Sequence, residues 1–211
     1  MDALIPFLGI VGALALGVVS PGPSFVFVVR TSLALSRRDG IAAALGMGGG
    51  GVIFAALALL GLQAVLAQIA WLYAALRLAG GCYLLYLATR LWRGAAEPIV
   101  VPGSADRRPP GLVWSFCLGL ATQLSNPKTA IVYGSIFAAL LPPSPPAWVV
   151  AALPPAVMLI ETGCYTIVAA AFSSEHPRAA YLRGKRWIDR AAGVVMGALG
   201  LRLVVEATQS G

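Results

Sequence analysis

The sequence predicts an all-α membrane protein of six transmembrane helices, arranged as two inverted three-helix repeats with the first and fourth helices broken at proline motifs. Three observations carry this prediction: strong apolarity, six apolar segments of spanning length, and matching proline motifs in the two halves. The chain of 211 residues is 59% hydrophobic and only 11% charged, and its mean hydropathy is +0.84. A soluble domain carries roughly a quarter charged residues, so most of this surface must face lipid.

The six predicted spans follow from length, because a membrane-crossing helix needs roughly twenty apolar residues. They run from Ala3 to Val29, Ile41 to Leu62, Leu66 to Trp92, Leu112 to Leu141, Trp148 to Phe172 and Ile188 to Val205. We expect one membrane domain, in which residues 1–93 form the first repeat, 94–110 a polar, proline-rich cytoplasmic linker, and 111–211 the second repeat.

The basic residues between the spans predict the orientation of the chain. They lie in the first, third and fifth connections: Arg30, Arg37, Arg38, Arg90, Arg93, Arg107, Arg108, Arg178, Arg183, Lys185 and Arg186. Basic loops of membrane proteins face the cytoplasm, so we expect the odd-numbered loops there and both termini on the outer side. Nucleic-acid binders instead concentrate such charge on a soluble face, so the net charge of +7 does not indicate one.

Matching motifs in the two halves predict the inverted repeat. Ser20–Pro23, which reads Ser-Pro-Gly-Pro, is matched in the fourth span by Ser125–Lys128, which reads Ser-Asn-Pro-Lys. Arg77–Gly80 in the third span is echoed by Arg190–Gly193 in the sixth. Two successive halves of three spans each lie in opposite orientations, which is the arrangement of many secondary transporters.

The proline motifs are expected to free backbone carbonyls, because proline lacks an N–H and displaces the carbonyl four residues earlier. Pro127, for example, should free the carbonyl of Gln123. In hydrocarbon an unpaired carbonyl costs several kcal/mol, so such breaks persist where they are buried in protein or line a cavity. Breaks at equivalent depth in both halves indicate a binding site. The alternative is that these prolines only kink two helices for packing.

Lys128 and Glu161 are ionisable residues that lie well inside predicted spans. A charge at the bilayer centre costs roughly 2.5 to 3.5 kcal/mol on insertion scales, so by default it faces the bundle interior and has a function. Glu161 is suited to bind a substrate ammonium or to carry a proton, and Lys128 to hold a carboxylate. The alternative is that the two simply pair with each other.

The candidate substrate-binding residues are therefore those of the two breaks together with these charges. They are Ser20, Pro21, Gly22, Pro23, Ser24, Gln123, Asn126, Pro127, Lys128 and Glu161. The first motif and Ser24 offer N–H groups and the positive end of a half-helix, which suit a carboxylate.

Small residues at helix-packing positions form a second set. They are Gly46, Gly50, Gly80, Gly193 and Gly197. Gly46 and Gly50 have the GxxxG spacing, and so do Gly193 and Gly197. Packing within one chain is favoured, and a homodimer is left open. No metal or cofactor is expected, because Cys82, Cys117 and Cys164 lie in apolar segments without a CxxC pair or an adjacent histidine. They are interpreted as small buried hydrophobic residues.

Several of these motifs occur in the order and spacing of a known family. Ser20–Ser24, Arg38–Gly40, Ala44–Gly46 and Leu78–Leu87 resemble the N-terminal half of the LysE/RhtB amino-acid exporters, and Asn126–Lys128 looks like the fourth-helix motif of that family. The resemblance covers nearly the whole chain. It implies efflux of amino acids or close derivatives across the bacterial inner membrane, by proton-coupled antiport driven by the proton motive force. The outer side, where the basic loops predict both termini, is then the periplasm.

The resemblance also implies an acidic residue in the fifth helix, where Glu161 lies. Many relatives carry a polar or acidic residue near the position of Gly51, so its absence here places more of any proton or cation role on Glu161.

A secondary exporter is the predicted function, with a small-molecule substrate, protons and the lipid bilayer as partners and with no enzyme activity. No ATP-binding motif is present, so transport is expected to be coupled to an ion gradient. A membrane cation exporter of related fold is the first alternative, but it needs several intramembrane carboxylates or histidines. A thiol-relay membrane protein is the second, and it needs two cysteines within disulfide reach.

Overall fold

The computed structural model describes residues 3–20, 22–68, 70–95, 111–142, 144–173 and 175–209. Side chains are described throughout these ranges except at residues 62–74, 76 and 175–181. This part of the chain forms eight helices and no strand. They are α1 (Leu4–Val19), α2 (Pro23–Ala34), α3 (Arg37–Gln68), α4 (Ala70–Gly94), α5 (Leu112–Leu124), α6 (Pro127–Leu140), α7 (Ala147–Phe172) and α8 (Glu175–Gln209). Pro21, Arg107, Arg108 and most of the predicted linker lie outside the described residues.

Both proline motifs fall between helices. The first predicted span covers α1 and the first part of α2, which continues past Val29 to Ala34. The two helices are bent by 54° relative to each other. The fourth predicted span consists of α5 and α6. In each case a proline, Pro23 or Pro127, is the first residue of the second half-helix. Proline is well suited to that position, because the missing N–H would have no helical partner there.

Three described helices are long and apolar enough to cross a membrane, and they are Arg37–Gly61 of α3, Ala147–Phe172 of α7 and Leu182–Gln209 of α8. The bent pair of α1 and α2 makes a fourth when it is counted as one span. Large apolar side chains such as Ile5, Leu159 and Ile167 are exposed on the helix surfaces, which suits lipid and not water. The chain is therefore a helical membrane protein, and the six-span inverted repeat stays a prediction.

Glycines allow α3 to pack closely against α5. A Cβ atom on Gly46 would collide with the backbone carbonyl of Phe116, and one on Gly119 would collide with the backbone of α3. A Cβ atom on Gly50 would lie 2.8 Å from the Cβ of Gln123. Small residues in membrane helices let backbones approach in this way. The position of Gln123, at the end of α5, is thus set by the surface of α3.

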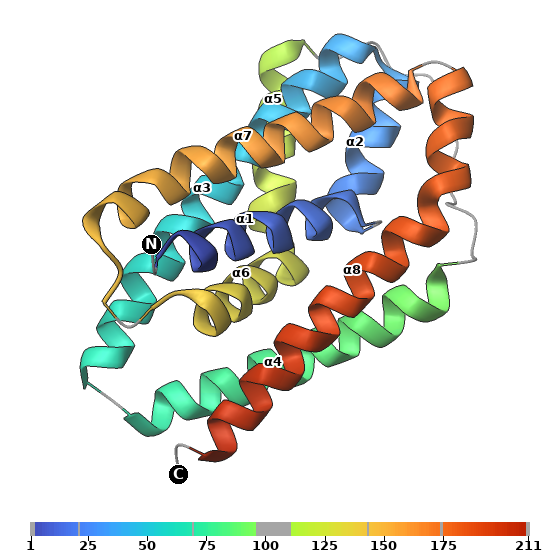
Figure 1. Ribbon diagram of the computed structural model, residues 1–211. Helices are drawn as coiled ribbons and strands as arrows, with labels where there is room; N and C mark the ends of the chain where they lie inside the picture. The colour runs from blue at the N-terminus through green and yellow to red at the C-terminus, as the bar shows by residue number, and fades with distance from the viewer. Residues whose placement is uncertain are drawn as a thin grey trace.

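α4 and α8 form a second close pair and run side by side along one side of the bundle (Figure 1). Gly81 and Gly200 face each other, so that a Cβ atom on either would lie 2.8 Å from the carbonyl oxygen of the other. Gly193 and Gly197 both face Ala88 of α4. The pair is therefore held together by backbone contact along much of its length.

Gly80 lies at a different contact, between the α4/α8 pair and the rest of the bundle. A Cβ atom on Gly80 would lie 2.6 Å from the Oγ of Ser135 on α6. Similarly, a Cβ atom on Gly17 of α1 would lie 3.3 Å from the Cε of Met196 on α8. Small residues on α1 and α4 therefore set how closely this pair approaches the broken helices.

α8 is longer than the sequence pattern predicted. It begins at Glu175 and not at Ile188, so Lys185 lies in a helix and not in a solvated loop. Lys185 is only 7% exposed, and its Nζ donates to the backbone carbonyl of Gly94 and to Oδ2 of Asp189, both at 2.8 Å. The loop prediction was wrong here because a hydropathy average does not register a helical segment whose charges pair with each other.

The three cysteines also differ from expectation. Cys82 on α4 and Cys117 on α5 are exposed, and Cys164 on α7 is partly exposed, so the prediction of buried thiols was wrong for the first two. All three are free thiols. An exposed cysteine on a membrane helix faces lipid at little free-energy cost, because the thiol behaves as a small hydrophobic group.

The glycine contacts predict the effect of a larger side chain. We expect Gly46→Leu to lower the free energy of unfolding by about 3 kcal/mol, because the new side chain must push the α5 backbone away from α3. Gly163→Leu on α7 is the matched control, since a Cβ atom there meets no other atom within 4 Å. Thermal unfolding of the detergent-purified proteins measures the difference. Equal unfolding midpoints for the two variants would contradict the close packing of α3 on α5.

Candidate functional site

The two helix breaks meet at a small cavity of about 30 Å³, which we call the inner cavity. Its lining comes from α1, α2, α5, α6 and α7. The residues are Leu14, Gly17, Val18, Ser20, Gly22, Ser24, Phe25, Gln123, Asn126, Lys128, Thr129, Val132, Tyr133, Glu161 and Tyr165. A bound water occupies roughly 10–15 Å³ of such space, so the inner cavity has room for one or two waters and not for a larger molecule.

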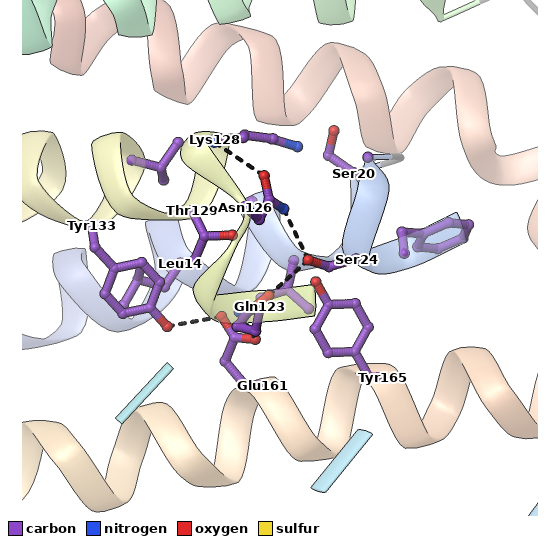
Figure 2. Close-up of a pocket in the computed structure, with 15 residues that line it drawn as sticks. Leu14, Ser20, Ser24, Gln123, Asn126, Lys128, Thr129, Tyr133, Glu161 and Tyr165 are labelled. Carbon is purple, nitrogen blue, oxygen red and sulfur yellow. Dashed lines mark hydrogen bonds between the residues drawn. The ribbon is translucent and has the colours of Figure 1, made fainter. Parts of the chain in front are cut away.

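A continuous chain of hydrogen bonds crosses from one break to the other (Figure 2). Asn126 Nδ2 donates to Ser24 Oγ at 2.9 Å. Ser24 Oγ donates to Gln123 Oε1 at 2.7 Å, and Gln123 Nε2 donates to Glu161 Oε2 at 2.8 Å. All four residues are buried. The chain therefore joins both breaks to the carboxylate of α7 without water.

Neutral donors hold the carboxylate of Glu161. Its Oε1 accepts from the hydroxyl of Tyr133 at 2.8 Å, so each oxygen has a partner. Within the described part of the chain, no ion pair joins Glu161 to Lys128. The interpretation that these two charges simply pair is therefore wrong for the described residues. A carboxylate held in this way can gain or lose a proton without breaking an ion pair.

Gly51 lies directly against this carboxylate. A Cβ atom on Gly51 would lie 2.9 Å from the Tyr133 hydroxyl and 3.1 Å from Cγ of Glu161. The glycine thus leaves space for both side chains to meet. A larger side chain at this position would crowd the Tyr133 hydroxyl and the Glu161 side chain.

Lys128 stands between the inner cavity and a much larger space. Its backbone N–H donates to Oδ1 of Asn126 at 3.0 Å, which caps α6. Its side chain extends past Gly22, where a Cβ atom would lie 3.2 Å from Nζ. Gly22, Asn126 and Lys128 line the inner cavity and also an outer cleft of about 700 Å³. These three residues therefore mark the boundary between the two spaces.

The outer cleft lies between the two breaks and the α4/α8 pair. Its lining residues are Gly22, Pro23, Val26, Tyr83, Tyr86, Leu87, Arg90, Leu91, Gly94, Asn126, Pro127, Lys128, Ile131, Lys185 and Asp189. The α4 residues come from its second half and the α8 residues from its first half, so the cleft faces the arginine-rich end of the bundle. Ligand pockets for small molecules commonly have volumes of about 300–1,000 Å³.

The structure brings the predicted site residues together. Pro21 lies outside the described residues, and the other nine line the inner cavity, the outer cleft or both. Ser20 is 2% exposed, and its Oγ has no hydrogen-bond partner among the described residues. The carbonyl of Gln123, in contrast, accepts the backbone N–H of Asn126 at 3.1 Å. The prediction that Pro127 leaves this carbonyl free for a ligand was therefore wrong, because the turn after α5 tightens to pair it.

Tyr133 and Asp189 are among the lining residues that were missed from the sequence. Tyr133 lies inside an apolar segment, and the rule that polar groups in spans face the interior applies to its hydroxyl as it does to Lys128. Asp189 is the second residue of the sixth predicted span, so it was not counted as intramembrane. The structure places it 2% exposed in the wall of the outer cleft.

Comparisons with known proteins agree with this picture of a membrane site. A family model described as LysE type translocator matches residues 15–207. The chain is 32% identical over 208 residues to the threonine efflux protein of Escherichia coli K12. The alignment covers 96% of this chain and 99% of that protein. It is 33% identical over 199 residues to the threonine efflux protein of Salmonella typhimurium LT2. That alignment covers 89% of this chain and 92% of the relative.

A more distant relative is the leucine efflux protein of Salmonella choleraesuis, which is 30% identical over 136 residues, with 61% of this chain and 59% of that protein covered. No solved structure shows significant similarity to the chain. The family match spans nearly all of the described helices, both breaks and Glu161. The chain therefore belongs to the family of LysE type translocators.

Proposed function

We propose that this protein exports amino acids or close derivatives from the cytoplasm as a secondary transporter driven by the proton motive force. The observation that carries the proposal is the buried chain from Asn126 to Glu161, which joins two helix breaks at the floor of a cleft of ligand size. Threonine and leucine efflux proteins among the relatives support amino acids as the substrate class.

The proposed topology is the inverted repeat in the bacterial inner membrane, with both termini in the periplasm. The order of helices supports it, because each half contains a broken pair followed by two long helices. The positive-inside rule assigns the arginine-rich ends of α2, α4 and α8 to the cytoplasm. On that assignment the outer cleft opens to the cytoplasm, and the hydrogen-bonded chain closes its floor.

The proposed mechanism is alternating access. A substrate enters the outer cleft and places its carboxylate at Lys128, beside the capped start of α6. Glu161 carries the proton, since neutral donors hold its carboxylate and the inner cavity admits water but not an amino acid. Passage then requires the contacts among Ser24, Gln123 and Asn126 to open. These contacts lie between the half-helices, so movement at the breaks opens them.

Substrate identity is tested by counterflow. Purified protein in proteoliposomes preloaded with L-threonine, L-leucine, homoserine lactone or a divalent cation is assayed for uptake of the same labelled compound. We expect amino-acid exchange well above that of empty liposomes, and weaker exchange for Lys128→Met because the carboxylate loses its partner. Exchange of divalent cations without amino acids would replace this proposal with a cation exporter. The described residues contain no group of three or more metal-ligating side chains.

Glu161→Gln tests the proton role. The amide keeps the shape and can still hydrogen-bond Gln123 and Tyr133, but it cannot exchange a proton at neutral pH. We expect amino-acid counterflow to persist, whereas accumulation driven by an imposed pH gradient is lost. Thr129→Ala, which alters the same cavity without removing a charge, is the control and should accumulate substrate. Gradient-driven accumulation by Glu161→Gln at the wild-type level would show that another group carries the proton.

A further inference from the structure

One carboxylate oxygen in the outer cleft lacks a partner. Asp189 is 2% exposed, and its Oδ2 accepts from Lys185 Nζ at 2.8 Å. Its Oδ1 is buried and has no hydrogen-bond partner among the described residues, and the side chain lines the outer cleft. A buried acceptor left unpaired costs about 1–3 kcal/mol, more if charged, so a bound donor at this oxygen is favourable.

A cation without a carboxylate partner lines the same cleft. Lys128 Nζ has no carboxylate within salt-bridge distance in the described part of the chain. It reaches the cleft from α6, and Asp189 reaches it from α8. One wall of the cleft therefore offers the ammonium of Lys128, and another wall offers the carboxylate of Asp189, of which one oxygen is paired and the other is not. This arrangement is complementary to a zwitterion, whose carboxylate and ammonium take the opposite charges.

Glu161 is not arranged to receive a substrate ammonium. Its two oxygens already accept from Gln123 and Tyr133, and the inner cavity beside it measures about 30 Å³. The outer cleft measures about 700 Å³ and contains Asp189. An ammonium group has three donors and needs several acceptors around it. The space and the free acceptor are thus both at Asp189.

We propose that Asp189 binds the α-ammonium of the substrate while Lys128 binds its carboxylate, so that the outer cleft selects intact zwitterionic α-amino acids. Lys185 Nζ donates to Oδ2 of Asp189 and to the end of α4, so Oδ1 is the oxygen of this carboxylate left for a ligand. The inference rests on the proposed function and divides its two tasks: the substrate amine binds on α8, and the proton binds on α7 at Glu161.

The test compares three ligands on the full-length protein in nanodiscs. They are L-threonine, 2,3-dihydroxybutanoate, in which a hydroxyl replaces the ammonium, and L-threoninamide, which lacks the carboxylate. We expect wild-type protein to bind threonine at least tenfold more tightly than either analogue, which corresponds to about 1.4 kcal/mol. Asp189→Asn should lose the preference over dihydroxybutanoate and keep the preference over threoninamide. Lys128→Met should lose the preference over threoninamide and keep the preference over dihydroxybutanoate.

Two further variants separate binding from folding. Lys185→Met breaks the ion pair but leaves the Asp189 carboxylate, so the preference for the ammonium should remain. The double variant Lys185→Met/Asp189→Asn removes both charges of the pair and should lose that preference as the single variant does. Equal weakening of all three ligands by Asp189→Asn would mean a structural role only and would overturn the inference. Absence of threonine binding by the wild-type protein would overturn the proposed function together with it.

Discussion

A broken helix in a membrane exposes backbone groups that lipid cannot satisfy, and this constraint organises the centre of the protein. Asn126 closes the break before α6 with two hydrogen bonds. Its side-chain oxygen accepts from the backbone N–H of Lys128, and its own backbone N–H donates to the carbonyl of Gln123. The remaining polar atoms of Asn126 and Gln123 then bond to Ser24 and Glu161. The polar site is therefore a direct consequence of interrupting two apolar helices at the same place.

The packing around this centre divides the molecule into parts that differ in how they can move. Backbone contact at Gly46 and Gly119 joins α3 to α5, and contact at Gly81 and Gly200 joins α4 to α8. If the two helices of either pair slid past each other, their backbone atoms would collide. Movement of one pair relative to the other is therefore easier than movement within a pair. The outer cleft lies at that junction, with the breaks on one wall and the α4/α8 pair on the other.

Local rules predicted much of this arrangement and failed where a partner from another helix decides the outcome. Proline chemistry located the breaks at Ser20–Pro23 and Ser125–Lys128, and the energetic penalty for charge in hydrocarbon identified Glu161. The same rules could not show that Glu161 bonds to Tyr133 and Gln123 and not to Lys128, because that choice depends on the relative placement of α5, α6 and α7. Asp189 was missed for a related reason, since its burial depends on Lys185 one turn earlier.

The pairing of Lys185 with Asp189 has a consequence for the biogenesis of the protein. Residues four apart on a helix are neighbours, so this pair can form as soon as α8 is helical, before any other helix is in place. A nascent segment then presents the insertion machinery with a neutral pair in place of two separate charges. The same lysine later docks on the carbonyl of Gly94, the last residue of α4. The contact that holds the carboxylate of Asp189 in the folded protein is thus also one that lowers the cost of bringing the last helix into the bilayer.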